Sequence, residues 1–245
     1  MTTITSLILL LAVALSGASC VGSGAVSPSG NLIERSPSAT VAPSASVLQI
    51  ATATPAPWLV GTPTPGAPAT VEIDDPDLTL TLPVGWAEYD MAMYRSLIEQ
   101  FAESSSPEVQ ALLAVHLKAI DAGAVRMAAG GLVAGANASY IIQVDSGDRS
   151  LEAAVARIRR FEAMATGSTV VDDGPVTLAI GPAVRRVETH AVAPGEEAGL
   201  VPSRTVEYIA RLDDGRTLWI LASAPGVATT FDALIDASVM TIKAR

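Results

Sequence analysis

This chain of 245 residues has little cysteine, histidine and aromatic side chain, and each shortage excludes a class of site. A single cysteine, Cys20, excludes an internal disulfide and a cysteine-rich metal centre. The two histidines, His116 and His190, could form a metal site only together with carboxylates from elsewhere. Aromatic residues make up 4% of the chain, which argues against a stacking platform for bases or sugars.

Positive charge is also scarce, with 15 Lys and Arg against 25 Asp and Glu and a formal net charge of -10. Nucleic acid and anionic lipid headgroups need clustered basic residues, so neither is expected as the main partner. The motifs H-E-x-x-H, C-x-x-C, G-x-S-x-G, G-x-G-x-x-G and the phosphate-binding loop are all missing from the sequence. We therefore expect no catalytic residue, no cofactor and no metal ligand, and a protein that is not an enzyme.

The N-terminus carries an export signature. Residues 7–15 form an apolar run of the length of a signal-peptide core, too short to span a bilayer. Small residues follow at 16–19 and end at Cys20, which resembles a bacterial lipobox. The resemblance implies a lipoprotein signal peptide over 1–19, a lipid on Cys20, and attachment to the outer face of the cytoplasmic membrane.

Two departures from the lipobox leave an alternative open. The segment before residue 7 has no Lys or Arg, and Gly17 stands where lipoboxes usually place leucine. The alternative is cleavage near Ala18, which would leave Cys20 as a free thiol on a secreted protein.

Residues 20–70 are rich in proline, serine, threonine and alanine, and only Glu34 and Arg35 carry charge. This composition disfavours helix and sheet and predicts a disordered linker. A flexible coil of that length has an end-to-end distance of roughly 40 Å, enough to hold a domain away from the membrane.

Periodic segments begin at residue 71 and predict one domain over 71–245. Alternation at 71–73 and 78–82 predicts two strands, with Leu78, Leu80 and Leu82 on one face. Residues 91–103 and 151–165 have helical spacing, with Ser150 as N-cap of the latter. A third helix begins at Ser106-Pro107.

The remaining segments are mostly strands. Strands are expected over 125–129, 138–144, 176–180, 183–192 and 204–212, and a helix over 230–242. Gly130-Gly131 reads as a loop, and Asp214-Gly215 as a two-residue hairpin turn that pairs Leu212 with Thr217. An antiparallel β-sheet covered by helices on both faces, an α+β fold, is the expected result.

Two short motifs carry a family resemblance. The strand 78–82 ends in P-x-G-W, and the last helix has the pattern F-x-x-x-I-x-x-S. The positions are Pro83, Gly85, Trp86, Phe231, Ile235 and Ser238. Together with the order of elements, they resemble the PsbP-like superfamily, which includes lipid-anchored bacterial proteins. The resemblance implies an α/β/α sandwich over 71–245 and an accessory or binding role rather than catalysis.

Candidate sites are few. Trp86 is expected to cover the edge of the core, with a ligand-binding wall as the alternative. Arg157, Arg159 and Arg160 form the densest basic patch, either a solvated helix face or a docking surface for an acidic partner. Arg185-Arg186 is a second, smaller patch.

Four acidic clusters could coordinate calcium, although turn-forming roles explain them more simply. They are Asp74-Asp75, Asp145 with Asp148, Asp172-Asp173 and Asp213-Asp214. His116 lies beside leucines on a predicted helix and is expected at the edge of the core, whereas His190 follows Glu188 on a strand.

These observations favour a membrane-anchored lipoprotein that acts as a non-enzymatic binding or accessory module of the cell envelope. Its expected contacts are the membrane, through the N-terminal lipid, and an envelope protein. Two alternatives stay open: a carrier of a small apolar ligand, and an envelope enzyme whose Asp, Glu, Tyr or His190 side chains meet only in space.

Overall fold

The structure, a computed structural model, describes residues 67–103, 105, 107–148, 150–162, 168–190, 202–226 and 229–245. The predicted signal peptide 1–19, Cys20, the linker up to residue 66 and the helix-capping Ser106 lie outside the described residues. Within the described part, no helix combines the length and the apolarity needed to cross a membrane.

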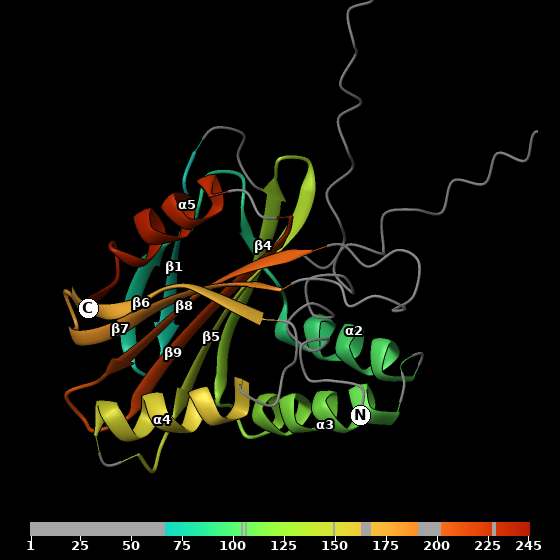
Figure 1. The fold of residues 1–245 in the computed structure, drawn as a ribbon, viewed down its shortest axis with the longest axis horizontal. Coiled ribbons are helices and arrows are strands. Elements are labelled where there is room, and N and C mark those ends of the chain that lie inside the picture. Colours follow the sequence, from blue (N-terminus) through green and yellow to red (C-terminus); the bar gives the residue numbers. More distant parts are fainter. Residues whose placement is uncertain are drawn as a thin grey trace, which may run out of the picture.

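A large antiparallel sheet of seven strands forms the centre of the domain (Figure 1). Its strands follow the spatial order β3-β4-β5-β9-β8-β7-β6. Their bounds are β3 (Ala87–Glu88), β4 (Val125–Val133), β5 (Ala136–Asp145), β6 (Ser168–Leu178), β7 (Gly181–His190), β8 (Ser203–Arg211) and β9 (Thr217–Pro225).

A second, three-stranded sheet was not anticipated. It has the order β1-β2-β10 and joins the start of the domain to its end. Its strands are β1 (Thr70–Asp74), β2 (Asp77–Thr81) and β10 (Lys243–Ala244), all antiparallel.

The helices divide between the two faces of the large sheet. Helices α2 (Met91–Glu103) and α3 (Pro107–Asp121) pack on β4 and β5, and α4 (Leu151–Glu162) packs on β8 and β9. The opposite face meets the small sheet and α5 (Thr230–Val239) (Figure 1). Antiparallel sheets combined with helices confirm the predicted α+β class.

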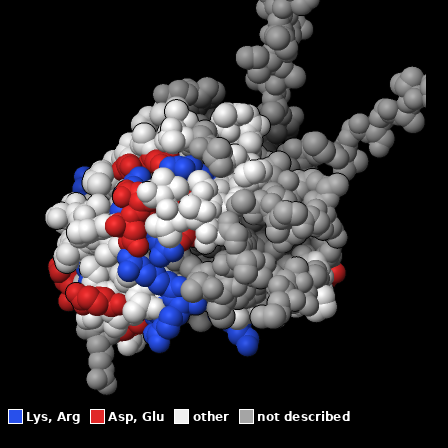
Figure 2. Space-filling model, viewed as in Figure 1, with Lys and Arg blue, Asp and Glu red and all other residues white. Residues whose placement is uncertain are grey.

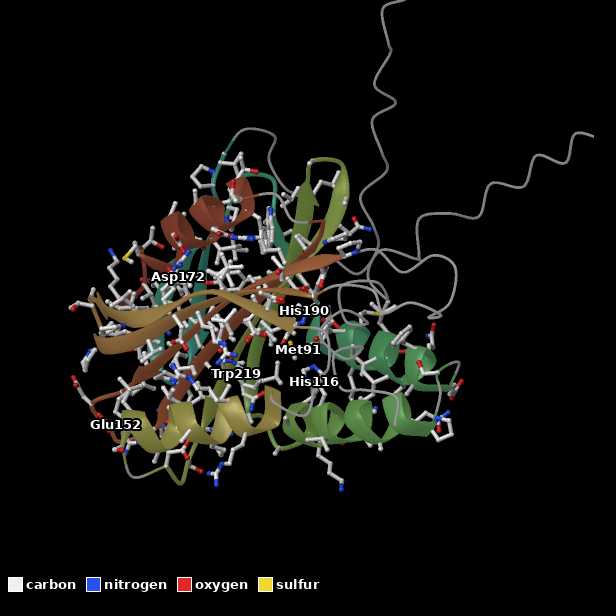
Figure 3. The ribbon with its side chains drawn as sticks, in the orientation of Figure 1. Met91, His116, Glu152, Asp172, His190 and Trp219 are labelled. Carbon is white, nitrogen blue, oxygen red and sulfur yellow. The ribbon has the colours of Figure 1, made fainter. Side chains whose placement is uncertain are left out.

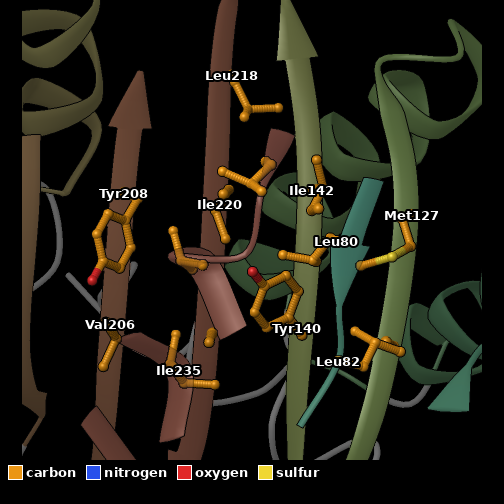
Figure 4. Close-up of a cluster of buried hydrophobic side chains, with 14 of the residues drawn as sticks. Leu80, Leu82, Met127, Tyr140, Ile142, Val206, Tyr208, Leu218, Ile220 and Ile235 are labelled. Atoms are coloured by element: carbon orange, nitrogen blue, oxygen red, sulfur yellow. The ribbon is translucent and has the colours of Figure 1, made fainter. Parts of the chain in front are cut away.

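The main core lies between the two sheets and α5. Figure 4 shows Leu80 of β2 and Leu82, the residue that follows this strand, facing Tyr140 and Ile142 of β5. Ile235 of α5 belongs to the same cluster. Each of these side chains is at most 1% exposed. The predicted face of Leu78, Leu80 and Leu82 is therefore the face that buries the small sheet against the large one.

Two of the helices follow the predicted local signals closely. Helix α2 covers the predicted residues 91–103. Helix α4 begins after Ser150, whose Oγ accepts a hydrogen bond from the backbone N–H of Ala153 at 3.2 Å. This bond satisfies one of the unpaired N–H groups at the helix start.

Two expected turns are wrong, and so is the register of one hairpin. Gly130 and Gly131 continue β4 instead of forming a loop, because aromatic rings lie on them and the turn comes at residues 134–135. Asp172 and Asp173 lie within β6, next to a bulge, and do not form a turn.

The hairpin register is also off by one residue. The loop between β8 and β9 has three residues, 213–215, so Arg211 rather than Leu212 pairs with Thr217. Gly215 supplies the positive φ of 84° that such a three-residue loop requires. As a result Trp219 shares a face with Ile209, under α4, and not with Tyr208.

Candidate functional site

The P-x-G-W motif forms a tight turn at the end of β2. The backbone N–H of Trp86 donates to the carbonyl of Pro83 at 3.0 Å, and Gly85 has a φ of 79°. A positive φ at the third position of a turn favours glycine, which explains why Gly85 is in the motif.

Trp86 lies in the core, with 1% of its surface exposed. Its ring covers Gly131, where a Cβ would come within 2.3 Å of Trp86 Cδ1, and meets Tyr140 edge-on at a centroid distance of 6.4 Å. The ring therefore packs the corner of the fold and leaves no surface for a ligand.

The second motif lies close to the first. Phe231, Ile235 and Ser238 are buried on the inner face of α5. Ser238 Oγ donates to the carbonyl of Thr81 at 2.6 Å, two residues before Pro83. The two motifs thus meet where α5 crosses the end of β2.

The basic patch on α4 is largely neutralised by carboxylates of the same chain. Arg157 Nη2 lies 2.9 Å from both Asp145 Oδ2 and Asp148 Oδ2, and Arg159 Nη2 lies 2.5 Å from Asp173. The hydrogen bond from Arg157 holds the pKa of Asp148 below its usual value, despite partial burial. Arg160 donates to the carbonyl of Ala156.

The second basic pair is likewise engaged. Arg185 contacts Asp236 at 2.9 Å and Asp172 at 2.6 Å, and Arg186 pairs with Glu188. Figure 2 shows this pattern as a band of alternating blue and red atoms down one side of the molecule. Such intramolecular pairing weakens the case for a docking surface at either basic patch.

The acidic clusters have arginine partners too. Asp75 pairs with Arg126 and Arg216, and Asp214 with Arg216. Asp74 lies 3.0 Å from Arg245, which also holds Glu72 and Asp77. Among the described residues, no group of three or more His, Cys, Asp and Glu side chains is arranged to hold a metal ion.

His116 lies between α3 and α2. Its Nε2 is 3.0 Å from the hydroxyl of Tyr94, and the two rings meet edge-on. Burial lowers the pKa of His116 to about 4, so the imidazole is neutral at neutral pH. This position agrees with the expected role at the edge of a core.

His190 belongs to a buried polar cluster whose members come from four strands and lie far apart in the sequence. The β7–β8–β9–β5 registers pair His190 with Ser203, Glu188 with Thr205, Thr205 with Ser223, and Ser223 with Ser139. We call these six residues the polar sheet patch: Ser139, Glu188, His190, Ser203, Thr205 and Ser223.

The polar sheet patch faces the helices α2, α3 and α4. Strand geometry places it on the same side of the sheet as Ile209 and Trp219, which pack on α4. Figure 3 shows His190 at the end of β7, on the side of α2 and α3. Each of the six residues is at most 3% exposed.

Several hydrogen-bonding atoms of the patch lack partners within the described part of the chain. His190 Nε2 lies 3.2 Å from Thr205 Oγ1 and 3.8 Å from Glu188 Oε2. Among the described residues, no partner is present for His190 Nδ1, Ser203 Oγ or Ser223 Oγ, although all three atoms are buried. Burial lowers the pKa of His190, against the opposing effect of the Glu188 charge.

Aromatic and charged groups border the patch. Tyr89 lies over Gly130, the cross-strand neighbour of Ser139, because a Cβ on Gly130 would come within 1.8 Å of the Tyr89 hydroxyl. Away from Tyr89, charged groups border the patch: Arg186 pairs with Glu188, and Trp219 Nε1 donates a hydrogen bond to Glu207.

The sequence carries no clear signal for the patch. Residues 186–190 and 203–207 each contain one apolar residue, Val187 and Val206, so their composition does not separate a buried strand face from one in contact with water.

Comparison with known proteins adds little. No family model matches the chain, and no curated protein matches it. One similar solved structure is a Bacteroides thetaiotaomicron VPI-5482 protein, with 9% identity and a TM-score of 0.34. The match covers 69% of this chain and 45% of that one, so this chain spans less than half the length of that protein. At this TM-score the likeness carries no argument about fold or function.

Proposed function

We propose that this chain is a lipid-anchored, non-enzymatic binding module on the outer face of the cytoplasmic membrane. The observation that carries binding over catalysis is the geometry around His190. A hydroxyl-activating triad needs a nucleophile on one ring nitrogen and an orienting group on the other. Here Thr205 Oγ1 lies 3.2 Å from Nε2, Glu188 stands beyond hydrogen-bond distance at 3.8 Å, and Nδ1 has no partner in the described part of the chain.

The anchoring proposal rests on Cys20, which ends a small-residue stretch after the apolar run 7–15. A lone cysteine in an exported chain is explained by lipid attachment, and two or three acyl chains would make the attachment stable. The linker 20–70 would then display the domain at a distance from the bilayer.

The accessory role is supported by the PsbP-like resemblance at Pro83, Gly85, Trp86, Phe231, Ile235 and Ser238. We extend that resemblance to the α/β/α sandwich architecture and to an envelope protein as partner.

The anchor is tested by comparing the wild type with Cys20→Ser in the native host. Wild-type protein should fractionate with membranes and incorporate labelled fatty acid, and Cys20→Ser should do neither. Retention of Cys20→Ser in the membrane fraction at the wild-type level would reject the lipid anchor.

The partner is tested by proximity labelling from the anchored wild-type chain. One envelope protein should be enriched over a control label attached to an unrelated lipoprotein. The accessory role is contradicted if the two labelled sets are the same across several growth conditions.

A further inference from the structure

We propose that two copies of this chain pair through the outer face of α3, with the two helices antiparallel. Helix α3 is apolar around much of its circumference, since nine of its 15 residues are Ala, Val, Leu or Ile. A helix of that kind is normally buried on all sides. Among the described side chains of α3, however, only Leu113 is buried. The helix lies at the margin of the molecule and packs on α2 and β4 with its inner side alone (Figure 1).

Helical spacing defines the outer face of α3. Ala111, Val115 and Lys118 follow one another at intervals of four and three residues, and all three are exposed, Val115 by 57%. Glu108 stands three residues before Ala111 and therefore on the same face of the helix. We call these four positions the α3 outer face. Along the helix they run acid, apolar, apolar, base.

This order is self-complementary when a second α3 runs in the opposite direction. In an antiparallel pair centred on residue 113, Ala111 of one copy faces Val115 of the other. The same register places Lys118 across from Glu108, because both pairs of positions are symmetric about residue 113. The small alanine leaves room for valine, and opposite charges meet at both ends. Shape and charge thus select the same register, and the contact is two-fold symmetric.

A second copy fits this face better than a bilayer does. Helices that lie on a membrane present large apolar side chains to the lipid and carry many basic residues beside them. The α3 outer face has one acid, one base and only alanine and valine between them. In a two-fold pair both charges find a partner, since each copy supplies both signs.

The contact is small, so its strength depends on the proposed membrane anchor, although its geometry does not. Stable interfaces bury about 1,200–2,000 Å² of surface in total, and one pair of short helices covers less. In dilute solution we therefore expect a monomer. Attachment of both copies to one membrane raises their effective concentration, as a tether does, and favours the pair.

Disulfide cross-linking of the full chain in membranes of the native host tests the pairing. Differently tagged chains that carry Ala111→Cys and Val115→Cys are co-expressed and oxidised. The register places these two positions opposite each other, and a disulfide needs Cα atoms within about 7 Å. The mixed disulfide should therefore form, whereas the wild-type chain, with Cys20 alone, gives the background.

The matched control combines Lys118→Cys with Val115→Cys. Both positions are exposed on the same face. In the proposed register Lys118 faces position 108, which is seven residues or about 10 Å along the helix from position 115. The yield of this mixed disulfide should be at least about fivefold lower than that of the first combination.

Charge reversal tests the ends of the contact. Lys118→Glu in both copies should lower the yield of the 111–115 disulfide about fivefold, since two exposed ion pairs become repulsive. Adding Glu108→Lys exchanges the two signs and should restore the yield. Lys243→Glu is the control, because it makes the same charge change at an exposed position of β10 and should leave the yield unchanged.

Two outcomes overturn the pairing. One is a 111–115 disulfide no more abundant than the 118–115 disulfide, which would also be the result if a different envelope protein covered α3. The other is an equal loss of yield in Lys118→Glu and Lys243→Glu. Fractionation of the same samples reports on the anchor separately. A chain recovered in the soluble fraction rejects the anchor, and after concentration to about 1 mM it should still give the 111–115 disulfide.

Discussion

Trp86 shows how one large side chain can depend on a residue that has none. Its ring occupies the space that a side chain at Gly131 would fill, so the glycine and the tryptophan have complementary shapes. Gly130 and Tyr89 repeat this arrangement on the other face of β4. These two contacts explain why a Gly-Gly pair is found inside a buried strand rather than in a loop.

Replacing Trp86 with alanine should remove this packing. Trp86 is 1% exposed, and truncating a buried aromatic residue lowers the free energy of unfolding by about 3–5 kcal/mol. Urea unfolding measures the loss. Val84→Ala is the control, since Val84 is 54% exposed two residues away and should change stability by less than about 0.5 kcal/mol. Wild-type stability in Trp86→Ala would place the ring outside the core.

His116 should make stability depend on pH. Its pKa is about 4 in the folded chain and 6.5 ordinarily, so only the unfolded chain binds the proton between these values. The free energy of unfolding should therefore fall as pH falls from 6.5 towards 4, and this group should have no effect above that range. The expected loss from about pH 7 to about pH 5 is about 2 kcal/mol.

The measurement is urea unfolding at both pH values for wild type and His116→Gln. Glutamine keeps a polar atom near the Tyr94 hydroxyl but does not titrate, so the variant should lose less stability on acidification. Contributions from His190 and from the carboxylates are common to both chains and cancel. Equal losses in the two chains would show that folding does not lower the pKa of His116.

At the scale of elements, α5 is held to the large sheet by ion pairs as well as by its apolar face. Arg204 of β8 contacts Asp232 through two bonds of 2.5 Å, and Arg185 of β7 contacts Asp236, which also accepts from the Tyr208 hydroxyl. The Arg204 side chain is 6% exposed, so Asp232 is needed to compensate the buried charge of its guanidinium.

Asp232→Ala should therefore be strongly destabilising. It leaves the buried Arg204 without its carboxylate, and breaking a buried pair costs about 3–5 kcal/mol. The double variant Asp232→Ala/Arg204→Met should recover most of the lost free energy of unfolding, because both charges are then gone. Chemical denaturation of both variants measures this.

The matched control is the exposed pair of Arg95 and Glu99, with side chains 39% and 42% exposed. Glu99→Ala should lose less than about 1 kcal/mol. If Asp232→Ala loses no more than Glu99→Ala, the α5 ion pair does not hold the helix.

Among the elements, helices were predicted more accurately than hairpins. Helix α2 and the start of α4 follow from apolar spacing and a capping serine, which are local signals. The β8–β9 register was missed because Asp213 to Gly215 can form either a two-residue or a three-residue loop. A change of one residue exchanges the two faces of the partner strand, and only packing against α4 selects between them.

At the scale of the whole molecule, the first and last strands close the domain together. Both β1 and β10 pair with β2, and the described core residues lie between Val71 and Ile242. We therefore expect a fragment of residues 67–245 to unfold at the same urea midpoint as the full chain.

The control is a fragment that begins at residue 83 and lacks β1, β2 and Leu82. It loses Leu80 and Leu82, which are at most 1% exposed, and should lack the near-UV circular dichroism of a packed core. A lower midpoint for 67–245 than for the full chain would mean that earlier residues contribute to the fold.

The sequence by itself determined the α+β class, the helix α2, the start of α4 and the turn at Pro83 to Trp86. These features depend on side-chain periodicity and on backbone preferences within a few residues. Only the tertiary structure decided that Gly130-Gly131 continue a strand, that a second sheet covers the first, and that His190 and three serines meet on a buried face. The burial of a strand face depends on what packs against it, and those partners are distant in the sequence.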